Sequence, residues 1–373
     1  MTSFLVIASF PESLLHFRGH LLTALQAKGV DVHVAAPNLI ENSLLCRQLQ
    51  KCGFIVHNIS LRRTGTNPLL DVFTLWQLWR LICEIKPTYT LTYTIKPVIY
   101  GNLASWLARV PNRFALITGL GYAFQGQSVT RIGIRLLVQL LYGLALRRTH
   151  KVFFQNPDDQ ILFRSLGLLS PKNLSCVVNG SGVDLKTYSL VPISTEPHFL
   201  LIARLLGDKG IREYAKAAQL IRMQFPNSKF SLVGWHDETP DAITLNELDD
   251  WVKKGALNFL GHLSDVRPVL ASCSVFVLPS YREGTPRAVL EAMAMGRAVI
   301  TTDVPGCRET VINEENGFLV PAKSVVALVE AMQRFIKEPD LAFRMGLRGR
   351  QIAEEKFDVH KVNAVMLKEM GLT

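Results

Sequence analysis

Short β-rich runs alternate with helical patterns along all 373 residues of the chain, and this alternation constrains the fold more than any other feature. Residues 4–9 and 31–37 have the composition of buried strands, and the helical pattern between them, 14–28, ends at Gly29. Strands joined through helices lie parallel in one sheet, with helices on both faces. The sequence therefore predicts an α/β fold.

The alternation comes in two series, separated by residues 185–197, which contain two prolines and no clear period and are typical of a linker. The first series has predicted strands at 4–9, 31–37, 54–59, 89–94, 114–118, 151–155 and 175–179. The second series has them at 199–205, 230–235, 257–261, 275–279, 299–302 and 318–320. We expect an N-terminal domain at 1–180 and a C-terminal domain at 181–354, both Rossmann-like and facing across a cleft. The C-terminal helix, about 355–373, is a candidate to pack back on the first domain.

The net charge of +10 is confined to the first half of the chain. Residues 1–180 hold 18 Lys/Arg against 7 Asp/Glu, whereas residues 181–373 hold 23 against 24. This asymmetry indicates an anionic partner for the N-terminal domain, namely a membrane surface, a phosphorylated acceptor or a nucleic acid.

Several residue patterns bear on the compartment. The six cysteines are scattered and form no C-x-x-C pair, which favours reduced thiols. No signal peptide and no run of 18 apolar residues is visible, so we expect a cytoplasmic protein that does not span a bilayer.

The strongest chemical signal lies in residues 275–302, VFVLPSYREGTPRAVLEAMAMGRAVITT. A predicted strand leads into a loop with Glu283 and Gly284, Pro286 occupies the expected first helical position, and Gly296 the expected helix end. Such a helix N-terminus offers N–H groups and partial positive charge to phosphate oxygens. Glu283 in the loop and Glu291 in the helix are suited to accept hydrogen bonds from sugar and ribose hydroxyls.

Other segments of the second half agree with this motif. They are N-G-S-G-V-D at 179–184, Ala203-Arg204 followed by Lys209-Gly210, Leu260-Gly261-His262, Asp303-Val304-Pro305-Gly306 and N-G-F-L-V at 316–320. Together they resemble the retaining glycosyltransferases of family 4, which have the GT-B fold and an E-x7-E signature. The resemblance spans nearly the whole C-terminal domain.

The resemblance implies a role for each matching residue. Arg204 and Lys209 would neutralise the diphosphate of a nucleotide-sugar donor, and Glu291 would hold its ribose. Glu283 and the backbone of Gly284, Thr285 and Pro286 would hold the transferred sugar and the distal phosphate. Leu263 would lie near the base. Preorganised cations and N–H donors stabilise the charge that develops on a departing diphosphate.

The N-terminal half resembles a narrower branch, through Y-T-I-K-P at 93–97, I-T-G-L-G-Y at 117–122 and F-Q-N-P-D-D at 154–159. These are similar to bacterial enzymes that lengthen undecaprenyl-diphosphate-linked glycans, one group of which adds N-acetylgalactosamine in an α-1,3 linkage. The resemblance suggests Lys96, Thr118 and Gly119 as acceptor-side residues. Many family members carry His where Thr118 stands, and Thr118 is no general base at neutral pH, so we assign no protein base. Which sugar moves, and to which acceptor, stays open.

Residues 131–148 predict a long helix with aliphatic side chains between basic ends. Two readings are open: the helix covers the parallel sheet, or it lies in a membrane interface with its apolar face down. With the charge asymmetry, the second reading predicts a peripheral protein on the inner face of the cell membrane.

Two other activities remain as alternatives, a GT-B-fold nucleotide-sugar epimerase or hydrolase and a non-enzymatic basic binding module. The first βα loop lacks a glycine triplet, which argues against a dinucleotide cofactor, and no nucleic-acid motif is recognised. His16 and His20 are four residues apart but have no third ligand, so we expect no metal and no other cofactor.

Overall fold

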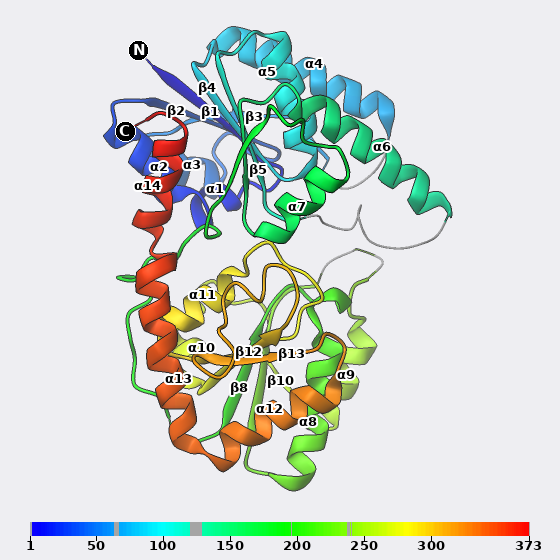
Figure 1. The fold of residues 1–373 in the computed structure, drawn as a ribbon, viewed down its shortest axis with the longest axis vertical. Coiled ribbons are helices and arrows are strands. Elements are labelled where there is room, and N and C mark those ends of the chain that lie inside the picture. Colours follow the sequence, from blue (N-terminus) through cyan, green and yellow to red (C-terminus); the bar gives the residue numbers. More distant parts are fainter. Residues whose placement is uncertain are drawn as a thin grey trace. The chain divides into compact units, whose positions relative to one another are not determined.

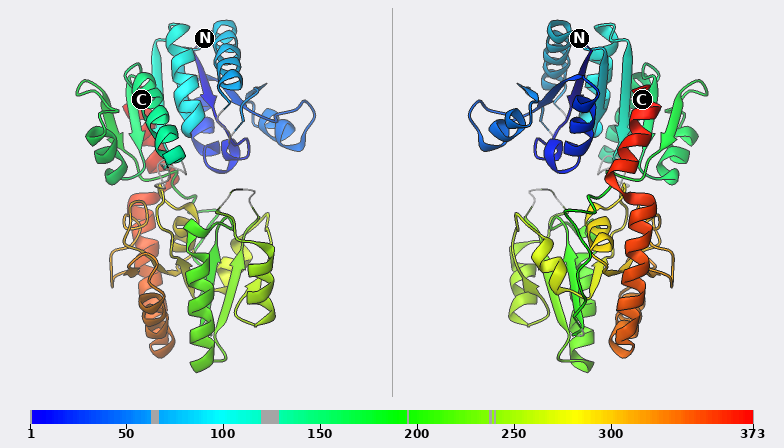
Figure 2. Two further views of the ribbon diagram at one scale, coloured as in Figure 1. Left: turned by 90° about the vertical axis from the view of Figure 1, so that its right-hand side faces the viewer. Right: turned by 90° about the vertical axis from the view of Figure 1, so that its left-hand side faces the viewer.

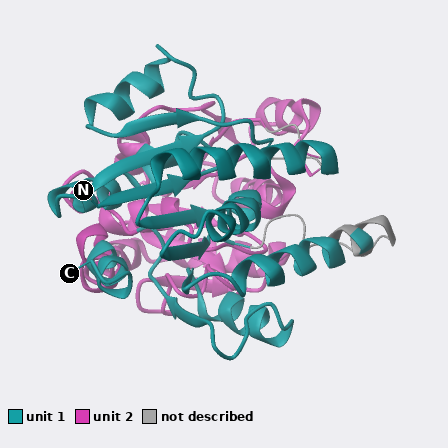
Figure 3. Ribbon diagram, turned by 90° about the horizontal axis from the view of Figure 1, so that it is seen from above, with its two compact units in different colours: residues 1–181, 362–373 teal, residues 182–361 magenta. Residues whose placement is uncertain are grey.

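The computed structural model describes residues 2–62, 67–119, 129–194, 196–236, 239 and 241–372, without the side chains of 129–132 and 134. Contacts between Cα atoms divide the chain into two compact units. Unit 1 comprises residues 1–181 and 362–373, and unit 2 comprises residues 182–361 (Figure 3). Of the C-terminal segment, residues 362–373 thus lie in unit 1, whereas residues 355–361 lie in unit 2.

Unit 1 is built on a seven-stranded parallel sheet with the order β3-β2-β1-β4-β5-β6-β7 (Figure 1). Its strands are β1 (Ser3–Ile7), β2 (Asp31–Ala36), β3 (Ile55–Asn58), β4 (Tyr89–Tyr93), β5 (Asn112–Ile117), β6 (Lys151–Phe154) and β7 (Leu174–Val177). Its helices are α1 (Ser13–His16), α2 (Gly19–Ala27), α3 (Leu44–Lys51), α4 (Pro68–Ile85), the π-helix η1 (Pro97–Gly101), α5 (Asn102–Leu107), α6 (Val129–Leu146), α7 (Pro157–Ser165) and most of α14 (Val359–Glu369).

Both faces of this sheet are covered, as the alternation predicts. On one face Phe4 and Val6 pack against α2, α3 and the end of α14. On the other face Leu5 and Ile7 pack against α4 and α5, while α6 and α7 cover neighbouring strands. Figure 2 shows helices on both sides of each sheet. None of the helices in the described part of the chain has the length and hydropathy needed to cross a bilayer.

The expectation of one helix over 14–28 is wrong. The chain forms α1 and α2 instead, because Arg18 leaves helical geometry, at φ −123° and ψ −6°. Arg18 is only 3% exposed, and its guanidinium lies 5.4 Å from the centre of the Tyr93 ring. The break thus coincides with burial of a charged side chain against an aromatic ring.

Unit 2 repeats the design with a six-stranded parallel sheet in the order β10-β9-β8-β11-β12-β13. Its strands are β8 (His198–Ile202), β9 (Lys229–Val233), β10 (Asn258–Phe259), β11 (Val275–Leu278), β12 (Ala298–Thr302) and β13 (Gly317–Val320). Its helices are the 3₁₀ turn η3 (Gly207–Lys209), α8 (Ile211–Gln224), α9 (Leu245–Lys253), α10 (Arg267–Ser272), α11 (Arg287–Ala294), α12 (Val325–Lys337), α13 (Pro339–Ile352) and the π-helix η4 (Ala353–Phe357). All thirteen strands expected from the sequence are present in the described residues, so the α/β prediction is confirmed for both units.

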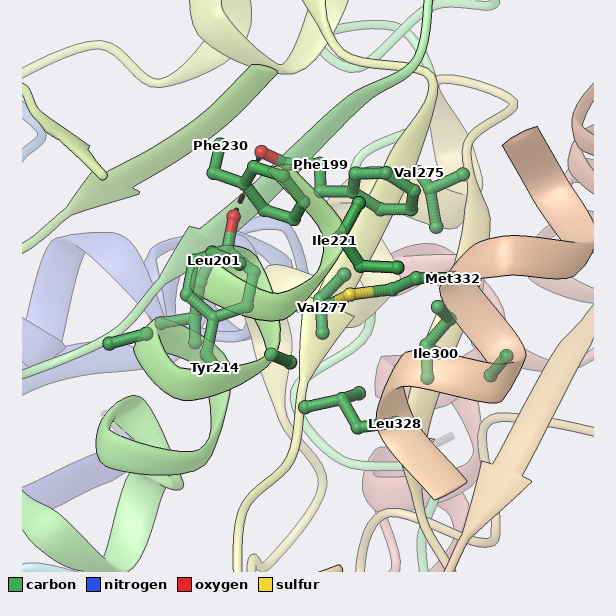
Figure 4. Packing of buried hydrophobic residues seen from close by; sticks show 14 of the residues in the cluster. Phe199, Leu201, Tyr214, Ile221, Phe230, Val275, Val277, Ile300, Leu328 and Met332 are labelled. Carbon is green, nitrogen blue, oxygen red and sulfur yellow. Dashed lines mark hydrogen bonds between the residues drawn. The ribbon is translucent and has the colours of Figure 1, made fainter. Parts of the chain in front are cut away.

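The larger core of unit 2 lies between its sheet, α8 and α12 (Figure 4). Phe199 of β8 stacks on Phe230 of β9 with ring centres 5.1 Å apart. Tyr214 of α8 is fully buried beside them, and its hydroxyl lies 2.9 Å from the carbonyl oxygen of Phe199 and 3.2 Å from that of Ser231. The core therefore fixes α8, and with it the loop that leads into this helix from β8.

We predict that Tyr214→Phe lowers the free energy of unfolding by about 1 kcal/mol, because a buried hydroxyl loses its hydrogen bond while the ring is kept. Urea unfolding followed by circular dichroism should show a lower midpoint with an unchanged slope. Met223→Ala, at an 82% exposed position on the same helix, is the control and should leave the midpoint in place. Equal midpoints for Tyr214→Phe and the wild type would contradict the assigned role.

Candidate active site

The candidate site of unit 2 lies where its strand order reverses. The chain runs from β8 outward to β9 and β10, then returns to β11 beside β8 and continues to β12 and β13. In open parallel sheets, ligands bind beyond the carboxyl ends of the strands at this point. The loops after β8 and β11 carry Arg204, Lys209 and Glu283, so three predicted site residues lie at the expected edge.

An ion pair joins these two loops. Lys209 Nζ lies 2.6 Å from Glu283 Oε1, and both side chains are largely buried, at 13% and 16% exposure. The hydroxyl of Ser280 donates to the same carboxylate oxygen at 2.8 Å. Burial opposes the charge of Lys209, but Glu283 and Asp208 outweigh it, and the pKa of Lys209 is raised. The lysine is therefore held charged at the strand ends.

Further charges surround the pair. Arg204 is close enough to act on both Asp208 and Lys209, and it lowers the pKa of each. Burial is the largest influence on Asp208 and raises its pKa overall, while Lys209 lowers it. The structure thus brings Arg204, Lys209 and Glu283 into one electrostatic cluster.

Glycines let the loops approach each other. Gly210 is the N-cap of α8 and lies in the left-handed region, at φ 70°, and a side chain there would clash with the carbonyl oxygen of Pro279. Gly306, at φ 87°, lies against the backbone of Glu283, whose N–H donates to Pro305 at 3.0 Å. Neither position has room for a Cβ atom, and positive φ favours glycine in any case. The position of Glu283 is therefore set from two sides.

The helix after the loop begins one residue later than expected. Pro286 has ψ 110° and occupies the N-cap, so Arg287 is the first residue of α11, and the expectation of Pro286 as first helical residue is wrong. An extended ψ at Pro286 keeps this residue outside the helix, where it contributes no side-chain cap. Gly296 ends the helix at φ 79° as predicted. Gly284, Thr285 and Pro286 thus immediately precede the N-terminus of α11.

Glu291 lies in α11 and is 8% exposed. Its Oε1 accepts from Arg287 Nε at 2.8 Å, one helical turn earlier. Tyr188 approaches it from the segment before β8: burial, the charge of Glu291 and a hydrogen bond to that carboxylate raise the pKa of the Tyr188 phenol. Glu291 is therefore a buried and oriented carboxylate rather than a solvated one.

The turn after β10 completes this side of the site. The N–H of Gly234, at the end of β9, donates to the carbonyl oxygen of Gly261 at 3.0 Å. Leu263 packs, partly buried, on the same core cluster as Tyr188, and Asp265 also acts on the pKa of Tyr188. The structure thus places Leu263 on the Glu291 side of unit 2.

The predicted acceptor-side residues lie in unit 1, at the carboxyl edge of its sheet. Lys96 follows β4 and Thr118 and Gly119 follow β5. Lys96 Nζ is paired with Asp71 Oδ1 of α4 at 2.7 Å. Residues 120–122 of the I-T-G-L-G-Y motif lie outside the described residues.

Three residues of the site, Ser280, Tyr188 and Arg287, were not predicted from the sequence. Ser280 precedes Glu283 by three residues and could have been found as part of the same loop. Arg287 stands four residues before Glu291, a spacing that places both on one helix face. No sequence pattern pointed to Tyr188, since it lies more than a hundred residues before Glu291, in the predicted linker.

The arrangement offers cations and oriented carboxylates to one ligand. Arg204 and Lys209 suit a polyanion, and Glu283 and Glu291 suit hydroxyl groups. In the described residues, no group of three His, Cys, Asp or Glu side chains is placed to hold a metal ion.

Comparisons with known proteins agree with this chemistry. Residues 7–156 match the model of the glycosyl transferase 4-like family, and residues 196–338 match that of the glycosyl transferases group 1 family. The chain is 29% identical over 355 residues, 91% of each protein, to N,N'-diacetylbacillosaminyl-diphospho-undecaprenol alpha-1,3-N-acetylgalactosaminyltransferase of Campylobacter jejuni. It is also 29% identical over 293 residues, covering 75% of this chain and 72% of the relative, to UDP-Gal:alpha-D-GlcNAc-diphosphoundecaprenol alpha-1,3-galactosyltransferase of Escherichia coli.

Solved structures share the fold over the full length. Sucrose-phosphate synthase from Thermosynechococcus elongatus aligns with a TM-score of 0.80 at 20% identity, covering 99% of this chain and 98% of that one. Anabaena HepE in complex with UDP aligns with a TM-score of 0.76 at 19% identity and covers 100% of both chains. The two family matches, the relatives and the shared GT-B fold together show that this chain belongs to the glycosyltransferases, with a glycosyl transferase 4-like N-terminal domain and a group 1 C-terminal domain.

Proposed function

We propose that the chain is a retaining glycosyltransferase that moves a sugar from a UDP-sugar to an undecaprenyl-diphosphate-linked sugar during glycan assembly at the cell surface. The observation that carries this proposal is the buried Lys209–Glu283 pair at the strand reversal of unit 2, with Glu291 in the helix that follows. Our best estimate of the donor sugar is N-acetylgalactosamine, transferred in an α-1,3 linkage.

The donor would bind along the loops of unit 2. Arg204 and Lys209 place positive charge beside its diphosphate. The backbone of residues 284–286 holds the distal phosphate at the N-terminus of α11. Glu291, oriented by Arg287 and Tyr188, accepts from the ribose hydroxyls. Glu283 accepts hydrogen bonds from hydroxyls of the transferred sugar, and Leu263 lies near the base.

The reaction would proceed on one face of the donor sugar. The bond between the anomeric carbon and the phosphate oxygen breaks, and the acceptor oxygen bonds to that carbon from the same side. The departing phosphate takes the acceptor proton, so the step requires no protein base in place of Thr118. Arg204 and Lys209 then stabilise the negative charge that grows on the diphosphate, which is the largest catalytic contribution expected of them.

Two observations support the lipid-linked acceptor. The relatives from Campylobacter jejuni and Escherichia coli carry names that specify undecaprenol-diphosphate acceptors and α-1,3 transfer. The excess of positive charge is confined to residues 1–180, which contain 18 basic and 7 acidic residues. An acceptor anchored in a bilayer requires the enzyme at the membrane surface, so we place it in the cytoplasm, peripheral on the inner face of the cell membrane.

The proposal is tested by incubating the purified protein with UDP- and GDP-sugars and a synthetic polyprenyl-diphosphate sugar. We expect transfer from a UDP-sugar, with UDP-N-acetylgalactosamine preferred and the anomeric configuration retained in the product. Release of free nucleotide at a rate unaffected by the acceptor would instead favour a hydrolase or epimerase. Inverted product stereochemistry would overturn the retaining mechanism alone.

We predict that Glu283→Ala and Glu291→Ala each lower transfer at least tenfold, while circular dichroism shows a folded protein. Each variant loses hydrogen bonds to a charged carboxylate, worth about 1.5–3 kcal/mol, or roughly 10- to 150-fold in rate. Glu330→Ala, an exposed position of α12, is the control. Near-normal rates in both site variants would remove the donor-site assignment.

We predict that Arg204→Ala and Lys209→Ala lower kcat more than they raise KM, by about 100-fold in kcat, because their charge matters most as the diphosphate departs. Lys254→Ala, which breaks an exposed pair with Asp250, should change neither constant. We also expect no loss of rate with a metal chelator. A pure KM effect would restrict both residues to donor binding, and inhibition by the chelator would contradict metal-independent transfer.

A further inference from the structure

The outer side of unit 1 carries a band of exposed apolar side chains on α4, α5 and α6. These helices cover one face of the same sheet, and α5 contacts both of the others. Their exposed large apolar residues are Leu69, Leu70, Val72, Phe73, Trp76, Trp79, Trp106, Leu107, Leu136, Leu137, Leu140 and Leu144. We call this set the apolar helix surface.

On α4 the exposed apolar residues form one stripe. Leu69, Val72, Phe73 and Trp76 are 80%, 64%, 47% and 48% exposed and recur at intervals of three and four. The opposite side of α4 is buried on the sheet through residues such as Leu78, which is 0% exposed. A helix that only covered a sheet would carry polar residues on its outer side. α4 is therefore apolar on both sides.

α6 repeats this pattern. Tyr142 and Leu146 are buried on the sheet, whereas Leu136, Leu137 and Leu140 are 58%, 54% and 61% exposed. One side of α6 therefore covers the sheet, as the first sequence interpretation expects, and its outer side stays apolar. Exposed apolar patches of this extent mark interaction sites.

Tryptophan and arginine lie together on this surface. Three of the five tryptophans of the chain are on it, and the Arg148 guanidinium lies 4.5 Å from the ring centre of Trp106. Arg80 lies 5.9 Å from the ring centre of Trp76. Tryptophan rings favour the boundary between water and lipid, and arginine pairs with lipid phosphates.

The charge of this region decides what covers the surface. Residues 67–150 contain nine Lys/Arg against two Asp/Glu, and one of these acids, Asp71, is paired with Lys96. A second copy of this chain docking face to face would bring two positive surfaces together, which is unfavourable. An anionic bilayer matches both the charge and the apolar side chains.

We propose that the apolar helix surface docks unit 1 on an anionic lipid bilayer, with the outer sides of α4 and α6 in the interface. This inference rests on the proposed function, since a polyprenyl acceptor resides in that bilayer. The surface also reaches the acceptor edge of the sheet, because Asp71 near the start of α4 holds Lys96 after β4. Docking through α4 would therefore present that edge to membrane-anchored acceptors.

The test is sedimentation with vesicles of phosphatidylcholine alone or with 30% phosphatidylglycerol. We expect binding to the anionic vesicles that weakens with salt and falls at least tenfold in two variants, Trp76→Ser with Trp79→Ser and Leu136→Ser with Leu140→Ser. Phe343→Ser is the matched control, since Phe343 is 54% exposed on α13 of unit 2. Brominated lipids should quench the fluorescence of Trp76 and Trp79 in protein that retains only these two tryptophans.

Transfer to a short water-soluble acceptor separates this inference from the proposed function. Both surface variants should keep wild-type transfer to that acceptor and lose transfer to a polyprenyl acceptor in vesicles. A wild type that binds vesicles but transfers to neither acceptor refutes the proposed function and leaves docking intact. Unchanged vesicle binding in both surface variants overturns the docking surface. A concentration-dependent dimer, seen by sedimentation velocity and abolished by the tryptophan substitutions, would also overturn the docking surface.

Discussion

The ion pair between Lys209 and Glu283 organises the candidate active site of this glycosyltransferase. It joins the loop after β8 to the loop after β11, the two neighbouring parallel strands at which the strand order reverses. Charges this far from water are costly unless they are paired and hydrogen-bonded, and Ser280 supplies the additional bond. The pair therefore keeps a cation and an oriented carboxylate at the strand ends before any ligand arrives. Gly210 and Gly306 permit this arrangement, because neither leaves room for a side chain.

Glu291, the second carboxylate of the site, is also buried and held by neighbouring side chains. Glu291 is buried in α11 and held by Arg287 and Tyr188, so its oxygens are directed rather than mobile. Because such side chains are already ordered, less binding free energy is lost in ordering them and more is available to stabilise the transition state. Substituting Ala for either carboxylate would also remove the ion pair that it forms with Lys209 or Arg287.

Unit 1 has two distinct features, the carboxyl edge of its sheet and the apolar outer sides of two helices. The carboxyl edge of its sheet holds Lys96 and Thr118, while α4 and α6 cover one face and remain apolar on their outer sides. Asp71 links the two, since it lies on α4 and binds Lys96. The unit that contains the excess of basic residues is therefore also the one that exposes these Trp and Leu side chains.

The sequence by itself determined the elements and the main carboxylates. Strand composition and helical periodicity are local properties, so the alternation predicted both parallel sheets, and the Glu283–Glu291 spacing with Gly284 and Gly296 predicted the loop and helix of the candidate site. Local rules placed the helix start at Pro286 and joined α1 to α2, and both details were wrong, because backbone torsions at Pro286 and burial of Arg18 decided them. Tertiary structure alone decided that Lys209 pairs with Glu283, that Tyr188 reaches Glu291, and that one side of α4 is left uncovered. These depend on residues distant in the chain meeting at one sheet edge or helix face, and no local pattern encodes such encounters.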